Sequence, residues 1–139
     1  MNKLLLQLTD KKLTISNSKG GPISGGLTSF AKCEDRASQG VDWQGCSKVG
    51  VYLKEKDLSG ANLQGANFEG ANLSGANLNK AILLGAKLEG ANLQGATITS
   101  AFLTKALVAG IKLKGAILDN TYWVNGKQCK PGSVGECIF

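Results

Sequence analysis

A five-residue period is the feature that most constrains this chain. The stretch SGANLQGANFEGANLSGANLNKA, residues 59–81, repeats Ala-Asn followed by an apolar residue four times in succession. Divided into fives from Val41, the chain gives 17 pentads without an insertion, ending at residue 125. The third position is Trp, Leu, Phe, Ile or Val in every pentad except the one that carries Lys48, and the first is Ala in eleven. An uninterrupted run of 17 repeats indicates a solenoid rather than an ordinary globular core.

A period of five fits neither an α-helix nor a continuous β-strand. On a helix of 3.6 residues per turn, a Leu every five residues makes no stripe. On a strand, an odd period sends successive Leu side chains to opposite faces. The pattern is consistent if each pentad is a short extended segment followed by a turn. Positions 1 and 3 then point inward, position 2 points outward, and Gly at position 5 supplies the turn.

These pentads resemble the pentapeptide repeat family over residues 41–125. The resemblance implies an all-β fold, a right-handed quadrilateral β-helix in which four pentads make one turn, with about four coils here. We therefore expect residues 20 apart to stack on one face. One inner column then runs from Trp43 to Trp123, so that the two tryptophans close the core at its two ends. Lys48 falls at an inward position, and we expect the first coil to be irregular because a buried unpaired Lys is costly.

The remaining residues are expected to cap the solenoid, because open ends need protection. The expected organisation is an N-terminal cap or extension at 1–40, the β-helix at 41–125 and a C-terminal cap loop at 126–139, forming one domain overall. The apolar run at residues 4–8 is short for a signal peptide, and we read it as part of the folded chain. Alternating apolar residues at 6–16 suggest a β-hairpin, with a short helix as the alternative, and 19–26 reads as a loop.

The four cysteines lie outside or at the edge of the repeats. Cys33 with Cys46 and Cys129 with Cys137 are the pairings favoured by proximity along the chain, and both stretches resemble the edges of exported members of the family. Free thiols are the alternative, and zinc is disfavoured because the chain has neither His nor a CxxC spacing. Disulfides imply an oxidising compartment, either the periplasm, the thylakoid lumen or the extracellular space. Without them the expected location is the cytoplasm.

No group of residues in the sequence predicts catalysis. His, the commonest general base, is absent, and no phosphate-binding glycine motif occurs. Glu69 and Glu89 are 20 apart, and we interpret them as part of a solvated face. Lys112 and Lys114 lack the Arg and aromatic neighbours typical of nucleic-acid sites. We therefore predict a non-enzyme without metal or cofactor that has no membrane span and is not a nucleic-acid-binding protein.

One outer face becomes apolar toward the C-terminus and is the candidate interaction patch. Its expected members, at positions 2 and 4 of successive coils, are Ile82, Leu84, Phe102, Tyr122 and Val124. Leu107 and Ile117 extend it onto neighbouring faces. Such a patch usually packs against something. Either the chain's own residues 1–40 or 126–139 fold over it, or it binds a second copy or another protein.

The sequence therefore favours a non-catalytic structural or protein-interaction module that works outside the cytoplasm and is stabilised by disulfides. A secreted effector or host-interacting protein is the first alternative. The family resemblance offers a second, since some members mimic DNA and bind type II topoisomerases. That role requires an acidic surface, whereas the pentads carry eight Lys against six Asp and Glu and the whole chain has a net charge of +6.

Overall fold

The computed structural model describes residues 31–139 of the chain. The hairpin or helix expected at 6–16, the loop at 19–26 and the segment at 4–8 lie outside these residues. The chain divides into two compact units, Met1–Arg36 and Ala37–Phe139, and the second unit contains the pentads. Between residues 31 and 139 no residue is helical, so no helix there is suited to crossing a membrane.

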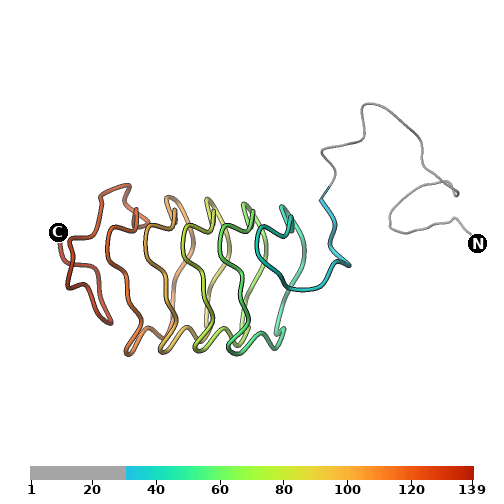
Figure 1. The fold of residues 1–139 in the computed structure, drawn as a ribbon, viewed down its shortest axis with the longest axis horizontal. Helices are drawn as coiled ribbons and strands as arrows, with labels where there is room; N and C mark the ends of the chain where they lie inside the picture. The colour runs from blue at the N-terminus through green and yellow to red at the C-terminus, as the bar shows by residue number, and fades with distance from the viewer. Residues whose placement is uncertain (1–30) are drawn as a thin grey trace, which may run out of the picture. The chain divides into compact units, whose positions relative to one another are not determined.

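The pentads form a coil whose successive turns lie one above the other (Figure 1). In each pentad the second residue forms the β-bridges, and positions 4 and 5 are turn residues. The bridges are isolated rather than joined into long strands, because each extended segment is interrupted by a turn every five residues. All parallel bridges in the described residues join positions 20 apart, beginning with Asp42 to Asn62 and ending with Phe102 to Tyr122. The register of 20 expected from the sequence is therefore confirmed.

In an interior pentad with Asn at position 2, every backbone N–H has a partner, as the pentad at residues 61–65 shows. Its five N–H groups donate, in order, to the C=O of Leu58 (3.0 Å), the C=O of Val41 (2.9 Å), the C=O of Ile82 (2.7 Å), Oδ1 of Asn62 (3.2 Å) and the C=O of Leu84 (2.9 Å). The first bond closes the preceding turn, and three others join neighbouring coils. The fourth is made by the Asn side chain of the same pentad. Backbone groups in a folded chain need such partners, which explains why Asn recurs at position 2.

The turns place position 5 in the left-handed region of backbone conformation. Gly65, for example, has a φ of 68°, which glycine adopts without steric cost. Five pentads put another residue there, with φ between 56° and 65°: Glu55, Lys80, Ser100, Lys105 and Asn120. These residues adopt an unfavourable conformation because the coil on either side determines the turn.

The core consists of the side chains at positions 1 and 3. From Leu58 to Leu103, every position-3 side chain has no exposed surface, and the Ala residues at position 1 are equally buried from Ala61 to Ala101, with at most 1% exposed. Trp43, at the first end, is 2% exposed, whereas Trp123 at the other end is partly exposed. Burial of one Leu stabilises a fold by about 1.5–3 kcal/mol before entropy is counted, so this repetitive core is the main stabilising element.

The first coil is regular, and the expectation that Lys48 would disrupt it is wrong. The N–H of Lys48 donates to the C=O of Asn67 at 2.6 Å, and Ser47 forms a parallel bridge with Asn67. The ammonium of Lys48 lies 4.0 Å from the centroid of the Trp43 ring, and the side chain is only partly buried. A lysine can bury its stem and keep its charge over an aromatic face or in water, so it avoids the cost that we expected.

The register also continues before Val41. The N–H of Gly40 donates to the C=O of Ser59 at 2.9 Å, which is the bond that position 5 makes in every following pentad of this coil. Gly40 has a φ of 71°, and the N–H of Val41 closes a turn onto Ser38. Residues 38–40 therefore share the turn geometry of the repeats, although their sequence lacks the apolar residue at position 3.

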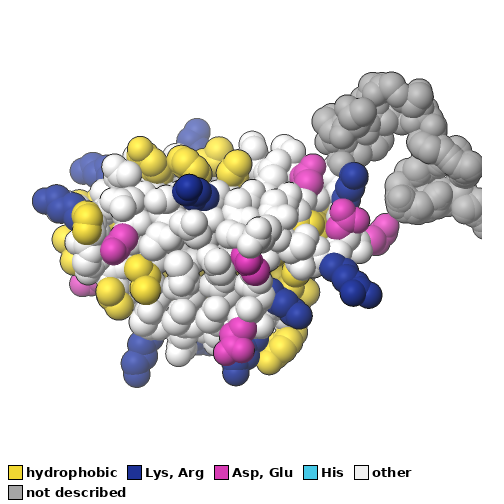
Figure 2. Space-filling view, viewed as in Figure 1, with side chains coloured by type: hydrophobic (Ala, Val, Ile, Leu, Met, Phe, Trp, Pro, Cys, Tyr) yellow, Lys and Arg dark blue, Asp and Glu magenta, His cyan; other side chains and the backbone are white. Residues whose placement is uncertain are grey.

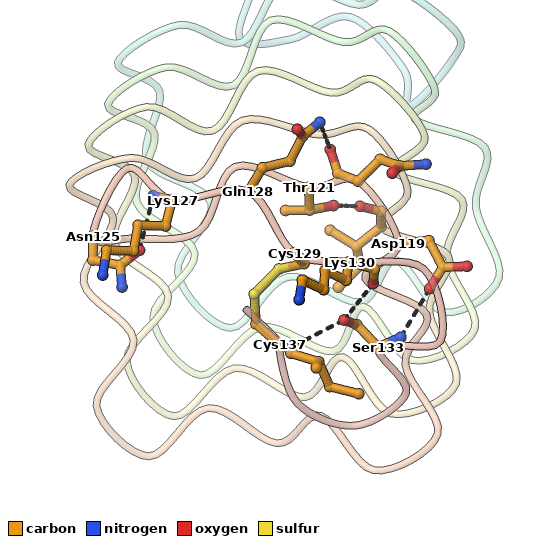
Figure 3. The surroundings of a disulfide bond; sticks show 12 residues. Asp119, Thr121, Asn125, Lys127, Gln128, Cys129, Lys130, Ser133 and Cys137 are labelled. Carbon is orange, nitrogen blue, oxygen red and sulfur yellow. Dashed lines mark hydrogen bonds between the residues drawn. A yellow bond between two sulfur atoms is a disulfide. The ribbon is translucent and has the colours of Figure 1, made fainter.

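The C-terminal segment, residues 126–139, folds back on two of the four faces of the coil. Gln128 and Val134 form antiparallel bridges with Tyr122 and Ile117. The carboxylate of Asp119 accepts the N–H groups of Gly132 (2.9 Å) and Ser133 (3.0 Å). A disulfide joins Cys129 to Cys137 within the segment (Figure 3). Backbone pairing and the Asp119 carboxylate thus attach the segment to the coil, and the disulfide links two parts of the segment to each other.

Candidate functional site

The coil brings the expected patch residues together on one face. Consecutive parallel bridges run from Asn62 to Ile82, from Ile82 to Phe102 and from Phe102 to Tyr122. Position 2 is therefore polar in the first coils of this face and apolar in the later ones. Leu84 and Val124 lie two residues beyond Ile82 and Tyr122, at position 4 of the same pentads. We call Ile82, Leu84, Phe102, Tyr122 and Val124 the apolar patch.

Two aromatic rings form the most exposed part of the apolar patch. The rings of Phe102 and Tyr122 are stacked, with centroids 5.4 Å apart and planes inclined by 4°. Phe102 is 38% exposed and Tyr122 is 37% exposed, and the other three members are partly exposed. Stacked aromatic side chains of this kind provide a rigid apolar surface that loses little entropy on binding.

Residues 126–139 do not bury the apolar patch. Gln128 of this segment forms an antiparallel bridge with Tyr122, the last residue of the patch face to form a bridge. The segment therefore extends the coil at its end. The C-terminal segment thus leaves both rings more than a third exposed. Covering of the patch by residues 1–40 stays a prediction, because residues 1–30 lie outside the described part of the chain.

The apolar patch lacks a hydrogen bond that Asp42 and Asn62 make in the first two coils of the same face. On the other faces, too, some later coils have a residue at position 2 that does not make it, such as Lys87 and Ile117. In seven pentads an Asn or Asp at position 2 accepts the N–H of position 4: Asp42, Asp57, Asn62, Asn67, Asn72, Asn77 and Asn92. An Ile, Phe or Tyr side chain has no oxygen in reach for this bond. Three pentads in succession on one face have thus exchanged a stabilising polar side chain for an exposed apolar one. The sequence analysis missed this signal because it treated the Asn only as an outward-facing residue.

Other exposed apolar side chains are distributed over the surface. Leu107 is 48% exposed and Ile117 is 39% exposed, on the two faces beside the apolar patch. Tyr52 and Val49, near the start of the coil, are 68% and 56% exposed, and the sequence analysis did not single them out. On the face that Figure 2 displays, the hydrophobic side chains form separate groups with charged and neutral surface between them.

The carboxylates of the pentads do not assemble into an acid–base pair. Asn67 donates a side-chain hydrogen bond to Oε1 of Glu69 at 3.2 Å, and Oε1 of Glu89 is buried without a hydrogen-bond partner. The described residues contain no group of three or more His, Cys, Asp and Glu side chains arranged to hold a metal ion. Hydrogen bonds from Gln39 and Ser59 lower the pKa of the exposed Asp57 carboxyl.

The cysteines of the described residues are all in disulfides. Cys129 and Cys137 are bonded to each other with their Cα atoms 5.0 Å apart, and Cys129 is 1% exposed. Cys33 and Cys46 are also disulfide-bonded, so residues 31–139 contain no free thiol. The cysteines therefore have a structural role in this state of the protein.

A family model described as pentapeptide repeats matches eight copies within residues 57–95 and 71–108. These are the pentads whose register and buried columns the structure shows. The chain belongs to the pentapeptide repeat family. Membership implies a right-handed β-helix for the coil described above. No curated protein matches the chain.

Several solved pentapeptide repeat proteins are similar to this chain. The protein Rfr23 from the cyanobacterium Cyanothece 51142 is 33% identical, over 57% of this chain and 54% of that one, with a TM-score of 0.47. HetL from Nostoc sp. strain PCC 7120, involved in heterocyst differentiation regulation, is 32% identical over 60% and 43%, with a TM-score of 0.34. A protein from the Arabidopsis thaliana thylakoid lumen is 30% identical over 73% and 74%, with a TM-score of 0.43. The chain spans about half the length of the first two relatives.

Proposed function

We propose that this pentapeptide repeat protein is a non-enzymatic interaction module that binds a protein partner through the apolar patch. The observation that carries the proposal is the exchange of Asn for Ile82, Phe102 and Tyr122 on successive coils of one face. Each exchange loses a hydrogen bond worth about 0.5–1.5 kcal/mol and exposes apolar surface. Selection for stability alone does not favour such a face, whereas burial against a partner compensates for both losses.

The proposed architecture is a right-handed quadrilateral β-helix of about four coils with caps at both ends. Residues 1–40 form the N-terminal cap or extension, 41–125 the β-helix and 126–139 the C-terminal cap. Trp43 and Trp123 close the core at its ends. The antiparallel bridges of Gln128 and Val134 support the role of the C-terminal segment, since they cover the edges at Tyr122 and Ile117.

The absence of enzymatic activity is part of the proposal. Pentapeptide repeat proteins are generally non-enzymatic structural modules. In the described residues the carboxylates that sequence reasoning considered, Glu69 and Glu89, are bonded to an amide or left without a partner, and neither contacts a base. General acid–base catalysis needs an acid or base positioned within hydrogen-bond reach of the reacting group, and we propose that these two carboxylates do not serve in this way.

The proposed location is outside the cytoplasm, in the periplasm, the thylakoid lumen or the extracellular space. The disulfide between Cys129 and Cys137, with Cys33 and Cys46 also oxidised, supports it. Disulfides persist mainly in oxidising compartments. The intact mass of protein from its native source, after alkylation of free thiols under denaturing conditions, tests this step. Four unmodified cysteines before reduction are expected, and four alkylated thiols would move the proposed location to the cytoplasm.

A secreted effector or host-interacting protein is the second candidate, and it uses the same patch with a partner from another organism. A DNA-mimicking, topoisomerase-binding protein is disfavoured. The eight Lys and six acidic residues of the pentads give the coil a positive rather than a negative charge. A DNA mimic must present the opposite sign to a DNA-binding surface.

Site-specific photo-crosslinking tests the patch. A benzophenone amino acid replaces Phe102 in protein produced in its native host, and the adducts are identified by mass. The matched control carries the same amino acid at Lys87, which also lies at position 2 but on another face. We expect an adduct at 102 that disappears when Ile82→Asn and Tyr122→Asn are introduced, because the coil accepts Asn at position 2. An adduct of twice the chain mass identifies a second copy as the partner. Equal adducts at 87 and 102, or none at 102, would contradict the proposal.

A further inference from the structure

The coil has a second candidate interaction site at its C-terminal edge, formed by residues 105–115. In the coil before it, N–H groups at position 3 donate to the next coil, as Leu88 does to Leu107 and Leu93 does to Lys112. At Val108 and Leu113 the same N–H groups have no partner among residues 31–139. The N–H of Gly110 and the C=O groups of Ala106 and Ile111 are equally unpaired within that range. We call residues 105–115 the open edge.

The C-terminal segment leaves the open edge uncovered because it pairs elsewhere. Its antiparallel bridges go to Tyr122 and Ile117, on the two other faces of the coil. Gly135 donates its N–H to the C=O of Ala116 and lies beside Leu113 and Gly115, at the end of the open edge that adjoins Ile117. Two adjacent faces thus end with backbone groups in the geometry that receives another strand, and such an edge is a template for strand addition.

The side chains of the open edge are partly exposed where their counterparts one coil earlier are fully buried. Leu88 and Leu93 have no exposed surface, whereas Val108 and Leu113, which stack on them, are partly exposed. Ile111 is partly exposed as well, and Leu107 is 48% exposed. A further layer that placed apolar side chains over Val108 and Leu113 would bury this surface in the same way that each coil buries the one below it.

The open edge is also the most uniformly basic part of the coil. Lys105, Lys112 and Lys114 are exposed, and the chain contains no Asp or Glu between Glu89 and Asp119. Lys112 and Lys114 project from one of the two unpaired faces. Figure 2 shows lysine side chains projecting from the coil near its C-terminal end. A partner segment with acidic side chains at its outward positions would complement this charge and pair faster and more selectively than a neutral one.

We propose that the open edge binds an extended acidic segment of another protein by parallel β-pairing, so that the segment adds a partial coil. The segment has apolar residues at the inward positions, Asp or Glu at the outward positions and a permissive residue such as Gly at the corner between the two faces. This site shares no residue with the apolar patch, although the two adjoin where the N–H of Lys105 donates to the C=O of Val124 at 3.0 Å. The failure of one proposal therefore leaves the other standing.

A ten-residue probe peptide, acetyl-ADLEGADLEG-amide, tests the proposal on the full chain. Amide hydrogen exchange is measured by NMR without and with the peptide. In the free protein, the N–H groups of Val108, Gly110 and Leu113 exchange rapidly, while those of Leu88 and Leu93 are protected. Saturating peptide is expected to slow the exchange of the first three by at least about tenfold, since β-pairing supplies their missing acceptors. The neutral peptide acetyl-ANLQGANLQG-amide is expected to bind at least threefold more weakly.

Charge-reversed variants separate the open edge from general electrostatic attraction. Lys112→Glu with Lys114→Glu should abolish the protection by the acidic peptide. The matched control, Lys54→Glu with Lys56→Glu, changes the net charge equally at exposed residues near the other end of the coil, and should leave the protection unchanged. Folding of each variant is checked by the protection of Leu88 and Leu93.

Three results would overturn the proposal. Protection of Val108 and Leu113 in the free protein that does not depend on concentration shows that the chain's own residues occupy the edge. Protection that rises with protein concentration shows that a second copy does. Binding of the acidic peptide without slower exchange at Val108, Gly110 and Leu113 shows that it attaches by charge alone.

Discussion

Asn72 offers the sharpest test of the hydrogen-bond scheme of the pentad. Its Oδ1 accepts the N–H of Ser74 at 3.0 Å and the Oγ–H of Ser74 at 2.7 Å, in a partly buried site. In each such pentad, the position-2 side chain accepts the N–H of position 4, for which neither the turn nor the neighbouring coils supply an acceptor. Asn72→Ala removes that acceptor while keeping the coil, its core and its inter-coil bonds.

The expected cost of Asn72→Ala is about 1 kcal/mol. One intramolecular hydrogen bond contributes about 0.5–1.5 kcal/mol, and two are lost. The Ser74 hydroxyl rotates toward water and recovers most of its share, so the backbone N–H accounts for the remainder. In a domain of about 100 residues, 1 kcal/mol corresponds to a decrease in Tm of roughly 4–8 °C. Asn72→Asp, which keeps the acceptor as Asp42 and Asp57 do, should stay within about 0.5 kcal/mol of the parent.

Urea denaturation followed by circular dichroism measures the free energy of unfolding, and native-state hydrogen exchange at Ser74 reports the local effect. The matched control is Lys87→Ala, which lies at position 2 of a pentad where Lys cannot accept this bond. If Asn72→Ala and Lys87→Ala destabilise the protein equally, the side chain at position 2 does not serve the backbone. The explanation of the recurring Asn, and of the apolar patch as a departure from it, would then fail.

The turn residues should respond in opposite directions to substitution. Gly65→Ala, at a φ of 68° with open space around the new Cβ, should lower the free energy of unfolding by about 1 kcal/mol. Lys80→Gly, at a φ of 63°, should raise it by up to about 1 kcal/mol. Urea denaturation measures both changes, and two changes of the same sign would contradict the turn geometry. The pKa of Asp57 is lowered first by the side-chain hydrogen bond from Gln39 (2.8 Å) and then by those from Ser59. The ionised carboxylate therefore stabilises the fold at pH values above its unfolded pKa. This contribution disappears as the pH falls through the lower folded pKa. In Asp57→Asn, the urea midpoint should therefore fall less steeply below about pH 4 than in the parent protein, when it is measured between about pH 2 and 6. An unchanged pH dependence in this range would contradict the role of the Asp57 carboxylate. Replacing Cys129 and Cys137 by Ser removes a link between residues 8 apart in sequence and should lower the free energy of unfolding by about 2–3 kcal/mol. Leu118 and Asn120 bond to the C-terminal segment, so their amide exchange should become faster. Exchange at Leu83, inside the coil, should change less.

The sequence was sufficient to predict the register and the inward columns. An uninterrupted period of five fixes which residues share a face, so Ile82, Phe102 and Tyr122 could be grouped before any coordinates were known. The role of Asn72 and its equivalents could not be predicted in the same way. It depends on which backbone groups the neighbouring coils leave unpaired, and that requires the hydrogen bonds of the folded coil.

The ends of the coil were the less predictable part. Lys48 was expected to disrupt the first coil, because a pattern of inward positions does not show that its ammonium can lie over Trp43. Residues 126–139 have no period, so nothing in them indicated antiparallel pairing with two faces only. The open edge follows from that pairing and was therefore invisible to sequence reasoning. Irregular ends depend on particular side-chain contacts, whereas the repeats depend on a pattern.

The bridges between residues 20 apart have a consequence for how such chains can change in length. Inserting or deleting 20 residues adds or removes one full turn and leaves every later side chain on its original face. Inserting a single pentad between Leu84 and Phe102 would be tolerated by the backbone, because every pentad makes the same bonds to the coils before and after it. It would nevertheless rotate all later residues by one face and separate Ile82 from Phe102 and Tyr122. Families built on this unit can therefore lose or move a binding surface by an insertion that leaves stability almost unchanged, and length differences among relatives are best compared as multiples of four pentads.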